Sequence, residues 1–442
     1  MIGEQEEINL SIKRFTAILM LSAALMCLAA PVSAYAERSE DGETAVSDSV
    51  PAGSDPDEAK AKDTTKAKDV TKNVSVKAKP KCNLNSVLDR NNATRSSLKK
   101  DTVLTCTSKK EIGGLYIETE APAGSITITA GERKIEADEE NFLHFYVGGI
   151  DAKKFKIKFN KAVTVTNIRF LTKGSLPDWV QFWEPAPQEC DLMIMSAHYD
   201  DDTLYFGGIA PWALDQGASV VVAFYCDHRQ EPYRKHEMLD AVWAYGVRYY
   251  PVFGAYADSG LVDYPTAVSQ LRKSGITWEK MLERQVEIYR KYKPQIVLTH
   301  SVTGEYGHSQ HILCEQISTE AAMMAGNENI FPDLTEKYGA HEVSKVYVHN
   351  YRGFLGKTVL DLDMPLESFD GRTPYEITVT AFRKHRSQVS GFIGWLTGPG
   401  SAAGIGSFSP CEWGLYYSSV GEDVSSDTLF DNIELIRERD NN

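Results

Sequence analysis

Apolar runs that alternate with helical patterns, from Asp191 onward, constrain the fold of this chain more than any other feature. Between them lie segments with apolar residues at helical spacing, such as "TWEKMLERQVEIYRKYK". The runs are short and have the composition of strands buried on both faces: "DLMIMSA", "ASVVVAFYC", "QIVLTHS" and "KVYVHNY". Strands and helices that alternate in this way build a sheet covered by helices on both faces. The sequence therefore predicts an α/β domain at 185–442, with a Rossmann-like, mostly parallel sheet.

The region 82–175 has a different periodicity. Runs such as "SITITAG" and "KFKIKFN" alternate apolar and polar residues and are separated by turn-forming residues. Period-two runs at this spacing predict a small antiparallel β-sandwich. The segments "LNSVLDRNNATR" and "VTNIRFLTKG" resemble discoidin-type modules. The resemblance implies contact with a cell-wall or surface glycan, and a structural spacer is the alternative.

The N-terminal residues have the pattern of a secretory signal. Lys13 and Arg14 precede the apolar run "FTAILMLSAALMCLAA", and small residues end at Ala36. The run is short for a membrane span, so we expect a signal peptide at 1–36 and no transmembrane span after its cleavage. Residues 37–81 contain almost no large apolar side chains, which predicts a disordered linker. The expected location is secreted or cell-surface.

Charge and cysteine usage exclude two classes of function. The formal net charge of −14 argues against nucleic acid, because phosphate binding needs clustered Lys and Arg. Beyond residue 36 the cysteines form no Cys-x-x-Cys pair, which argues against a cysteine metal site. In an exported protein, Cys82 and Cys106 are the pair that we expect to form a disulfide, since both lie in one small region.

The segment "MSAHYDDDTLYFGG" places polar residues where the first strand of the α/β domain ends. It contains His198 and three consecutive aspartates, Asp200, Asp201 and Asp202. Ligands of such sheets bind at the carboxyl ends of the strands. A histidine and a carboxylate three residues apart on a tight turn can converge on one cation. The alternative is that the aspartates cap a helix or lie in solvent.

A second polar segment follows the strand "QIVLTH". It contains His308 and His311, one helical turn apart, in "GEYGHSQH". Topology brings this loop to the same edge of the sheet as the aspartate-rich turn. His-x-x-His alone is common on surface helices, but an aspartate and two histidines with a water are the ligands of an open, catalytic zinc site. Together the two segments favour a metal site.

These segments carry a family resemblance. "SAHYDDDTLYFGG" and "GEYGHSQH" resemble the two signatures of the PIG-L/LmbE-like zinc-dependent N-deacetylases. "YRKHEMLDAVWAYGV" and "FRKHRSQ" are similar to further elements of that family, so the resemblance covers the chain from about Asp191 to its end.

The resemblance implies a role for each of five residues. The implied metal ligands are His198, Asp201 and His311. Zn²⁺ is the expected ion, and Fe²⁺ or Co²⁺ could use the same ligands. Asp200 would be the general base, and a protonated His308 would stabilise the oxyanion.

Two residues depart from the family pattern. Tyr199 stands where the family usually has proline, and Asp202 where it has glutamate. Proline fixes φ, so its absence predicts a less preorganised turn. Neither position is an implied ligand, so we expect the chemistry to be retained.

Three further residues have open alternatives. Arg234 is predicted to bind substrate, with pairing to a carboxylate as the alternative. His385 is predicted to line the substrate site, and its alternative is to cap and pack the last helix. His300 ends a strand near the site and is expected to be a buried, hydrogen-bonded histidine.

The predicted activity is that of an exported, metal-dependent hydrolase that removes N-acetyl groups from N-acetylglucosamine-type sugars in a glycan or glycoconjugate. The first alternative is an esterase or amidase that acts on another acylated substrate, because the same site would serve both reactions. The second is a non-catalytic surface protein that binds glycans.

Overall fold

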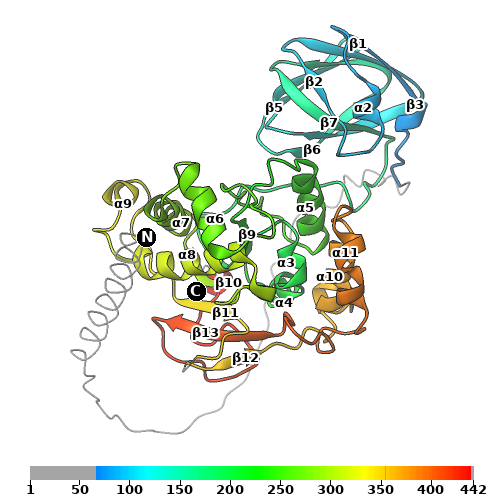
Figure 1. Cartoon of the computed structure of the whole chain (residues 1–442). Helices are drawn as coiled ribbons and strands as arrows, with labels where there is room; N and C mark the ends of the chain where they lie inside the picture. Colours follow the sequence, from blue (N-terminus) through cyan, green and yellow to red (C-terminus); the bar gives the residue numbers. More distant parts are fainter. Residues whose placement is uncertain (1–65, 354, 440–442) are drawn as a thin grey trace, which may run out of the picture. The chain divides into compact units, whose positions relative to one another are not determined.

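The computed structural model describes residues 66–353 and 355–439 (Figure 1). The predicted signal peptide and the first part of the predicted linker lie outside these residues. Within the described part, no helix is both long and apolar enough to cross a membrane.

The N-terminal part of the described chain is a seven-stranded antiparallel sheet. Its strands are β1 (Val74–Lys79), β2 (Ser96–Leu98), β3 (Thr102–Thr119), β4 (Gly124–Ala130), β5 (Arg133–Glu140), β6 (His144–Phe159) and β7 (Val163–Leu171). They run in the order β2-β7-β3-β6-β4-β5, and β1 also pairs with β3. The predicted antiparallel region is thus confirmed, although one hydrogen-bonded sheet replaces the two of a sandwich. The reason is the length of β3, which pairs with β1, β6 and β7 across register shifts.

Two expectations for this region are wrong. Residues 74–79, which we assigned to a disordered linker ending at 81, form β1 and pair with β3 from Val103 to Ser108. The alternation "VSVKAK" explains the difference, because Val74 is buried and every second residue after it packs on the same core. Cys82 and Cys106 are free thiols, so the expected disulfide is not formed.

The second sheet belongs to the α/β region and has six strands. They are β8 (Cys190–Ser196), β9 (Val220–Phe224), β10 (Pro294–Thr299), β11 (Lys345–His349), β12 (Lys357–Val359) and β13 (Glu412–Ser418). Their order is β12-β13-β11-β10-β8-β9. The pairs β9-β8, β8-β10 and β10-β11 are parallel, whereas β13 pairs antiparallel with β11 and β12. The predicted mixed α/β fold is confirmed, and the one strand that runs against the other five, β13, is not indicated by the sequence pattern.

Helices cover both faces of this sheet. The larger helices are α4 (Ile209–Asp215), α5 (Tyr233–Ala244), α6 (Tyr264–Lys273), α7 (Trp278–Tyr292), α8 (Ser309–Ala325), α9 (Pro332–Tyr338), α10 (Pro374–Phe382) and α11 (Val389–Thr397). The short ones are η1 (Thr71–Asn73), α2 (Asn85–Leu88), α3 (Asp201–Leu204), η2 (Glu305–Gly307), η3 (Glu367–Phe369) and α12 (Ile436–Arg439). Successive residues of β8 enter two different apolar cores: Leu192 and Ile194 enter one, and Met193 and Met195 the other. This alternation is expected of a strand that is buried on both sides.

The chain that follows β8 is not one continuous helix. It forms α3 and then α4, and Gly208 between them has φ of 90°, a conformation that glycine adopts without strain. Because β8 and β10 are adjacent and parallel, the turn after β8 and the loop after β10 lie at one edge of the sheet. The predicted site is located at this edge.

Candidate metal centre

The turn after β8 directs its carboxylates into the site. Asp201 Oδ2 accepts a hydrogen bond from the backbone N–H of His198 at 2.8 Å, which folds the turn back on itself. Asp200 occupies the N-cap position of α3 but makes no side-chain capping bond. The aspartates are also buried. The alternative interpretation, in which the aspartates cap a helix or lie in solvent, therefore does not apply to this turn.

The second segment is fixed by the start of α8. His308 is the N-cap residue, and its Nδ1 accepts a hydrogen bond from the backbone N–H of Gln310 at 3.2 Å. His311 lies in the first turn of the same helix and is fully buried. Capping by His308 thus sets the direction in which His311 points.

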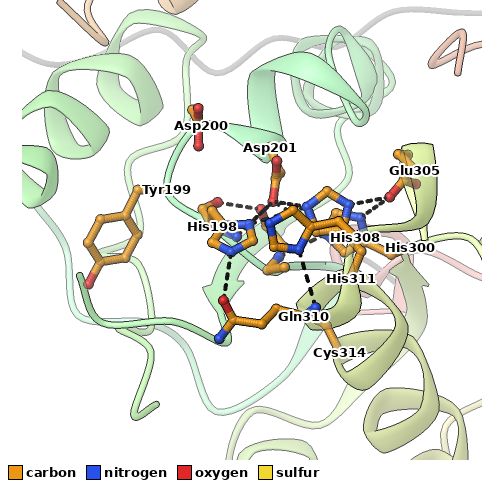
Figure 2. Close-up of polar contacts among 12 residues, drawn as sticks. His198, Tyr199, Asp200, Asp201, His300, Glu305, His308, Gln310, His311 and Cys314 are labelled. Carbon is orange, nitrogen blue, oxygen red and sulfur yellow. Dashed lines mark hydrogen bonds and ion pairs between the residues drawn. The ribbon is translucent and has the colours of Figure 1, made fainter. Parts of the chain in front are cut away.

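Three ligand atoms from the two segments form a nearly equilateral triangle (Figure 2). His198 Nδ1 lies 2.9 Å from Asp201 Oδ2 and 3.2 Å from His311 Nε2, and the third side of the triangle is 3.0 Å. A tetrahedral zinc ion with bonds near 2.0–2.1 Å needs ligand atoms about 3.3 Å apart. The triangle therefore fits such an ion after an expansion of a few tenths of an ångström.

The charges within the triangle suit a cation. Burial acts to raise the pKa of Asp201, but the charges and hydrogen bonds of His311 and His198 outweigh it and hold the pKa well below its usual range. Burial acts to lower the pKa of His311, but Asp201 and Glu305 raise it to about 10. The carboxylate thus stays ionised and attracts positive charge, either a proton on His311 or a metal ion that displaces it.

Gln310 orients the ring of His198. Its side-chain oxygen lies 3.2 Å from His198 Nε2 and accepts a hydrogen bond from the backbone N–H of Ser259 at 2.9 Å. An amide oxygen only accepts, so Nε2 of His198 carries a proton, and Nδ1 is the nitrogen that would offer a lone pair to an ion in the triangle. This tautomer is the one that metal binding through Nδ1 requires.

His308 differs in one respect from the prediction. Burial and the neighbouring charges of His198 and His311 lower the pKa of His308 to about 3. The ring is therefore neutral, and because Nδ1 accepts the capping bond, the proton resides on Nε2. His308 can still donate a hydrogen bond, but as a neutral imidazole and not as the protonated ring that we expected.

Arg234, on α5, contacts the predicted base. Its NH2 donates to Asp200 Oδ1 at 2.6 Å, and both side chains are 7% exposed. Its NH1 lies 3.8 Å from Asp258 Oδ2. The structure thus places Arg234 against a site carboxylate, which is the alternative to a direct role in substrate binding.

His385, the other predicted substrate-binding residue, is buried behind the same turn. Its Nε2 lies 4.0 Å from Asp202 Oδ1, and neither atom has a hydrogen-bond partner in the described chain. Asp202 Oδ2 accepts from the Tyr245 hydroxyl at 2.7 Å. Burial, together with the charges of Asp200 and Asp201, raises the pKa of Asp202 well above its usual range.

The sequence reasoning missed several residues that contact the triangle. Glu305 bonds to His311 and His300, and Gln310 bonds to His198. His300 is buried and hydrogen-bonded, as expected: its Nε2 accepts from the backbone N–H of Ala197 at 2.8 Å. Glu305 and Gln310 both lie within the "GEYGHSQH" segment, which is the signal that could have found them.

Comparison with known proteins gives a family match for one segment of the chain. A family model described as PIG-L, GlcNAc-PI de-N-acetylase, matches residues 193–322. This segment is a PIG-L domain. The PIG-L domain supplies the three atoms of the triangle and also Asp200, His308 and Arg234. His385 lies after this domain in the chain.

The PIG-L region is similar to named deacetylases. A 1D-myo-inositol 2-acetamido-2-deoxy-alpha-D-glucopyranoside deacetylase of Streptomyces scabiei is 27% identical over 182 residues, which are 35% of this chain and 54% of that protein. A protein of the same name, numbered 1, from Frankia alni is 26% identical over 47% of this chain and 89% of its own length. The match therefore spans about half of the length of the Streptomyces relative. Among solved structures, the N,N'-diacetylchitobiose deacetylase of Pyrococcus horikoshii has a TM-score of 0.38 at 15% identity, over 52% of this chain and 83% of its own.

Proposed function

We propose that this chain is a metal-dependent N-deacetylase that removes the acetyl group from N-acetylglucosamine-type sugars in a glycan or glycoconjugate. The observation that carries the proposal is the triangle of His198 Nδ1, Asp201 Oδ2 and His311 Nε2, with the Asp200 carboxylate on the same turn. The PIG-L domain and the acetamido-sugar names of its relatives support the substrate class. The parallel strands β9-β8-β10-β11 would serve as the Rossmann-like scaffold.

Each residue has a definite task in this reaction. A zinc ion held by the triangle would polarise the acetyl carbonyl and activate a water. Asp200 takes a proton from the attacking water and later delivers it to the nitrogen as the C–N bond breaks. Neutral His308 donates its Nε2–H to the carbonyl oxygen as negative charge develops there. The products are acetate and the free amino sugar.

Arg234 and Gln310 prepare these groups for the reaction. Arg234 binds one oxygen of Asp200 and leaves the other for the water. Gln310 keeps the proton of His198 on Nε2, away from the metal-binding nitrogen. Both act through another residue, so we regard them as positioning residues.

We also propose that the enzyme acts outside the cytoplasm, on secreted or surface glycans. The support is the N-terminal sequence, with Lys13 and Arg14 before an apolar run. Contact of the antiparallel domain with a surface glycan is supported by its discoidin-like segments.

The first experiment measures metal content and acetate release together. It uses the chain from Glu37 onward, with N-acetylglucosamine, its oligomers and peptidoglycan fragments as substrates. Asp200→Asn should retain the metal and lose turnover by about 100-fold or more, since it removes only the base.

Asp202→Asn is the matched control. It makes the same change two residues away, at a side chain that hydrogen-bonds to Tyr245 and supplies none of the three triangle atoms, so we expect metal content and turnover near those of the wild type. A wild type that binds no metal would overturn the site assignment. Metal binding without acetate release from any of these substrates would instead refute the substrate class and favour another acylated substrate.

A further inference from the structure

Glu305 is a fully buried carboxylate that the proposed reaction does not use. It lies in η2, between β10 and α8, and its two oxygens contact three histidines. Oε2 lies 2.7 Å from His300 Nδ1 and 2.6 Å from His311 Nδ1, and Oε1 lies 2.6 Å from His349 Nδ1 (Figure 2 shows the first two). One carboxylate thus joins residues from the ends of β10 and β11 and from the start of α8.

The contact with His311 determines which of its nitrogens can bind a metal. A carboxylate only accepts hydrogen bonds, so Nδ1 of His311 carries a proton. Nε2 is then the nitrogen that can offer a lone pair, and it is Nε2 that belongs to the triangle. A carboxylate behind a metal-binding histidine in this way fixes its tautomer and its ring orientation.

The contact with His300 extends the effect to the other half of the site. His300 Nδ1 donates to Glu305, and His300 Nε2 accepts from the backbone N–H of Ala197. Ala197 directly precedes His198 in the chain. Glu305 therefore restrains both segments that supply the triangle, α8 directly and the turn after β8 through one histidine.

His349 holds the second oxygen of Glu305. Its Nδ1 donates to Oε1 at 2.6 Å, and its Nε2 lies 2.9 Å from the Ser409 carbonyl oxygen and 3.2 Å from Asn350 Nδ2. Each oxygen of the buried carboxylate therefore has a hydrogen-bond donor, and these bonds offset part of the cost of burying its charge.

We propose that Glu305 is a positioning residue of the metal centre, and that His349 holds Glu305 in place. Glu305 sets the tautomer of His311 and, through His300, the position of the turn that carries His198 and Asp201. The inference rests on the proposed function, because it requires that the triangle binds a metal ion.

The test is the zinc affinity of Glu305→Gln, measured by competition with a chelating dye. A glutamine amide would direct N–H groups at one or two histidine nitrogens that already carry protons, which forces a change of tautomer. Loss of a carboxylate behind a metal-bound histidine typically weakens metal binding 10- to 100-fold, and we expect a change of this size. With saturating Co²⁺, the visible absorption bands of this variant should also shift, because a merely structural role would leave the ligand geometry unchanged.

Glu315→Gln is the matched control. Glu315 is also a buried carboxylate, on α8, and its side chain accepts only a long hydrogen bond of 3.4 Å from Thr319 among the described residues. The same isosteric change there should leave the zinc affinity within twofold of the wild type. Equal affinities for Glu305→Gln and the wild type would overturn the inference.

His349→Gln keeps the inference testable if Glu305→Gln does not fold. The new amide can still donate to Glu305, so only part of the restraint is lost, and we expect a zinc affinity 3- to 10-fold below that of the wild type. An unchanged affinity would refute the role of His349. If Glu305→Gln cannot be measured, the same result would also refute the role of Glu305. A wild type without zinc would be a failure of the proposed function itself, which distinguishes the two results.

Discussion

The pair of Arg234 and Asp200 allows a quantitative test of how the predicted base is held. Arg234→Leu removes the guanidinium 2.6 Å from the carboxylate, and both side chains are almost fully buried. An ionised carboxylate left without its partner in such a place typically costs about 3–5 kcal/mol of stability. Asp258 and Glu231 lose the same cation at 3.8 and 3.6 Å, but both are partly exposed, so solvent compensates most of their loss. We therefore expect a loss of about 4 kcal/mol.

Asp200→Asn should cost less. The amide oxygen can still accept a hydrogen bond from Arg234, and Asp258 and Glu231 still face the guanidinium. A loss of about 1–2 kcal/mol is expected from weakening one charged hydrogen bond. In the double variant neither charge of the pair remains, so the combined loss should be smaller than the sum by about 2 kcal/mol, a coupling typical of contacting residues.

The assay is urea unfolding of the metal-free protein at pH 7, followed by circular dichroism. Losses that add within about 0.5 kcal/mol would refute the reasoning, because independent sites behave in that way. Arg234 would then act elsewhere, as a substrate-binding side chain does. In that case Arg234→Leu should raise KM for the acetylated sugar and leave the unfolding midpoint unchanged.

Three further predictions concern stability. Burial lowers the pKa of His385 to about 4, so acid protonates the unfolded ring, with its ordinary pKa near 6.5, before the folded one. The stability contributed by the neutral ring is complete above pH 6.5 and is lost as the pH falls toward 4. In urea unfolding at pH 7 and 4.5, the wild type should therefore lose more stability on acidification than His385→Gln does, by up to about 3 kcal/mol. Gly207→Ala would place a Cβ 2.4 Å from the Thr203 carbonyl oxygen and should cost about 2 kcal/mol or more, seen as a lower melting temperature in calorimetry. Arg290 is fully buried and donates to four backbone carbonyl oxygens, so Arg290→Met should cost about 3 kcal/mol or more, and a loss below 1 kcal/mol would contradict this account.

The sequence predicted the site well where periodicity and topology act together. The apolar strands β8 and β10 are recognisable in the sequence, and the rule that parallel strands end at one edge predicts that His198 and His311 lie close together. The same rule could have found His300 and His349, because each directly follows or ends an apolar strand, "QIVLTH" and "KVYVH". This signal alone does not single them out, because a histidine at the end of a strand is more often a structural residue than a functional one.

Other features could not be predicted from local pattern. Glu305 lies in a short loop with no periodicity, and its importance arises only when folding brings His349 to it from 44 residues away. The position of β13 between β11 and β12 depends on a chain reversal that no pattern in "EWGLYY" indicates. The error at residues 74–79 has another cause, since a composition rich in lysine obscured a short alternating strand.

The departure at Tyr199 shows how the turn keeps its shape without proline. The backbone N–H of Tyr199 donates to Nε2 of His228 at 3.3 Å, a contact that proline could not make. Its hydroxyl donates to the Asp227 carbonyl oxygen at 3.2 Å, and its ring packs edge-on against Phe224. Nδ1 of the same His228 ring lies 3.1 Å from Arg234 NH1 and 3.2 Å from Asp258 Oδ2. Hydrogen bonds and packing thus replace the restraint of a proline ring, and they link the turn to the residues that surround Arg234.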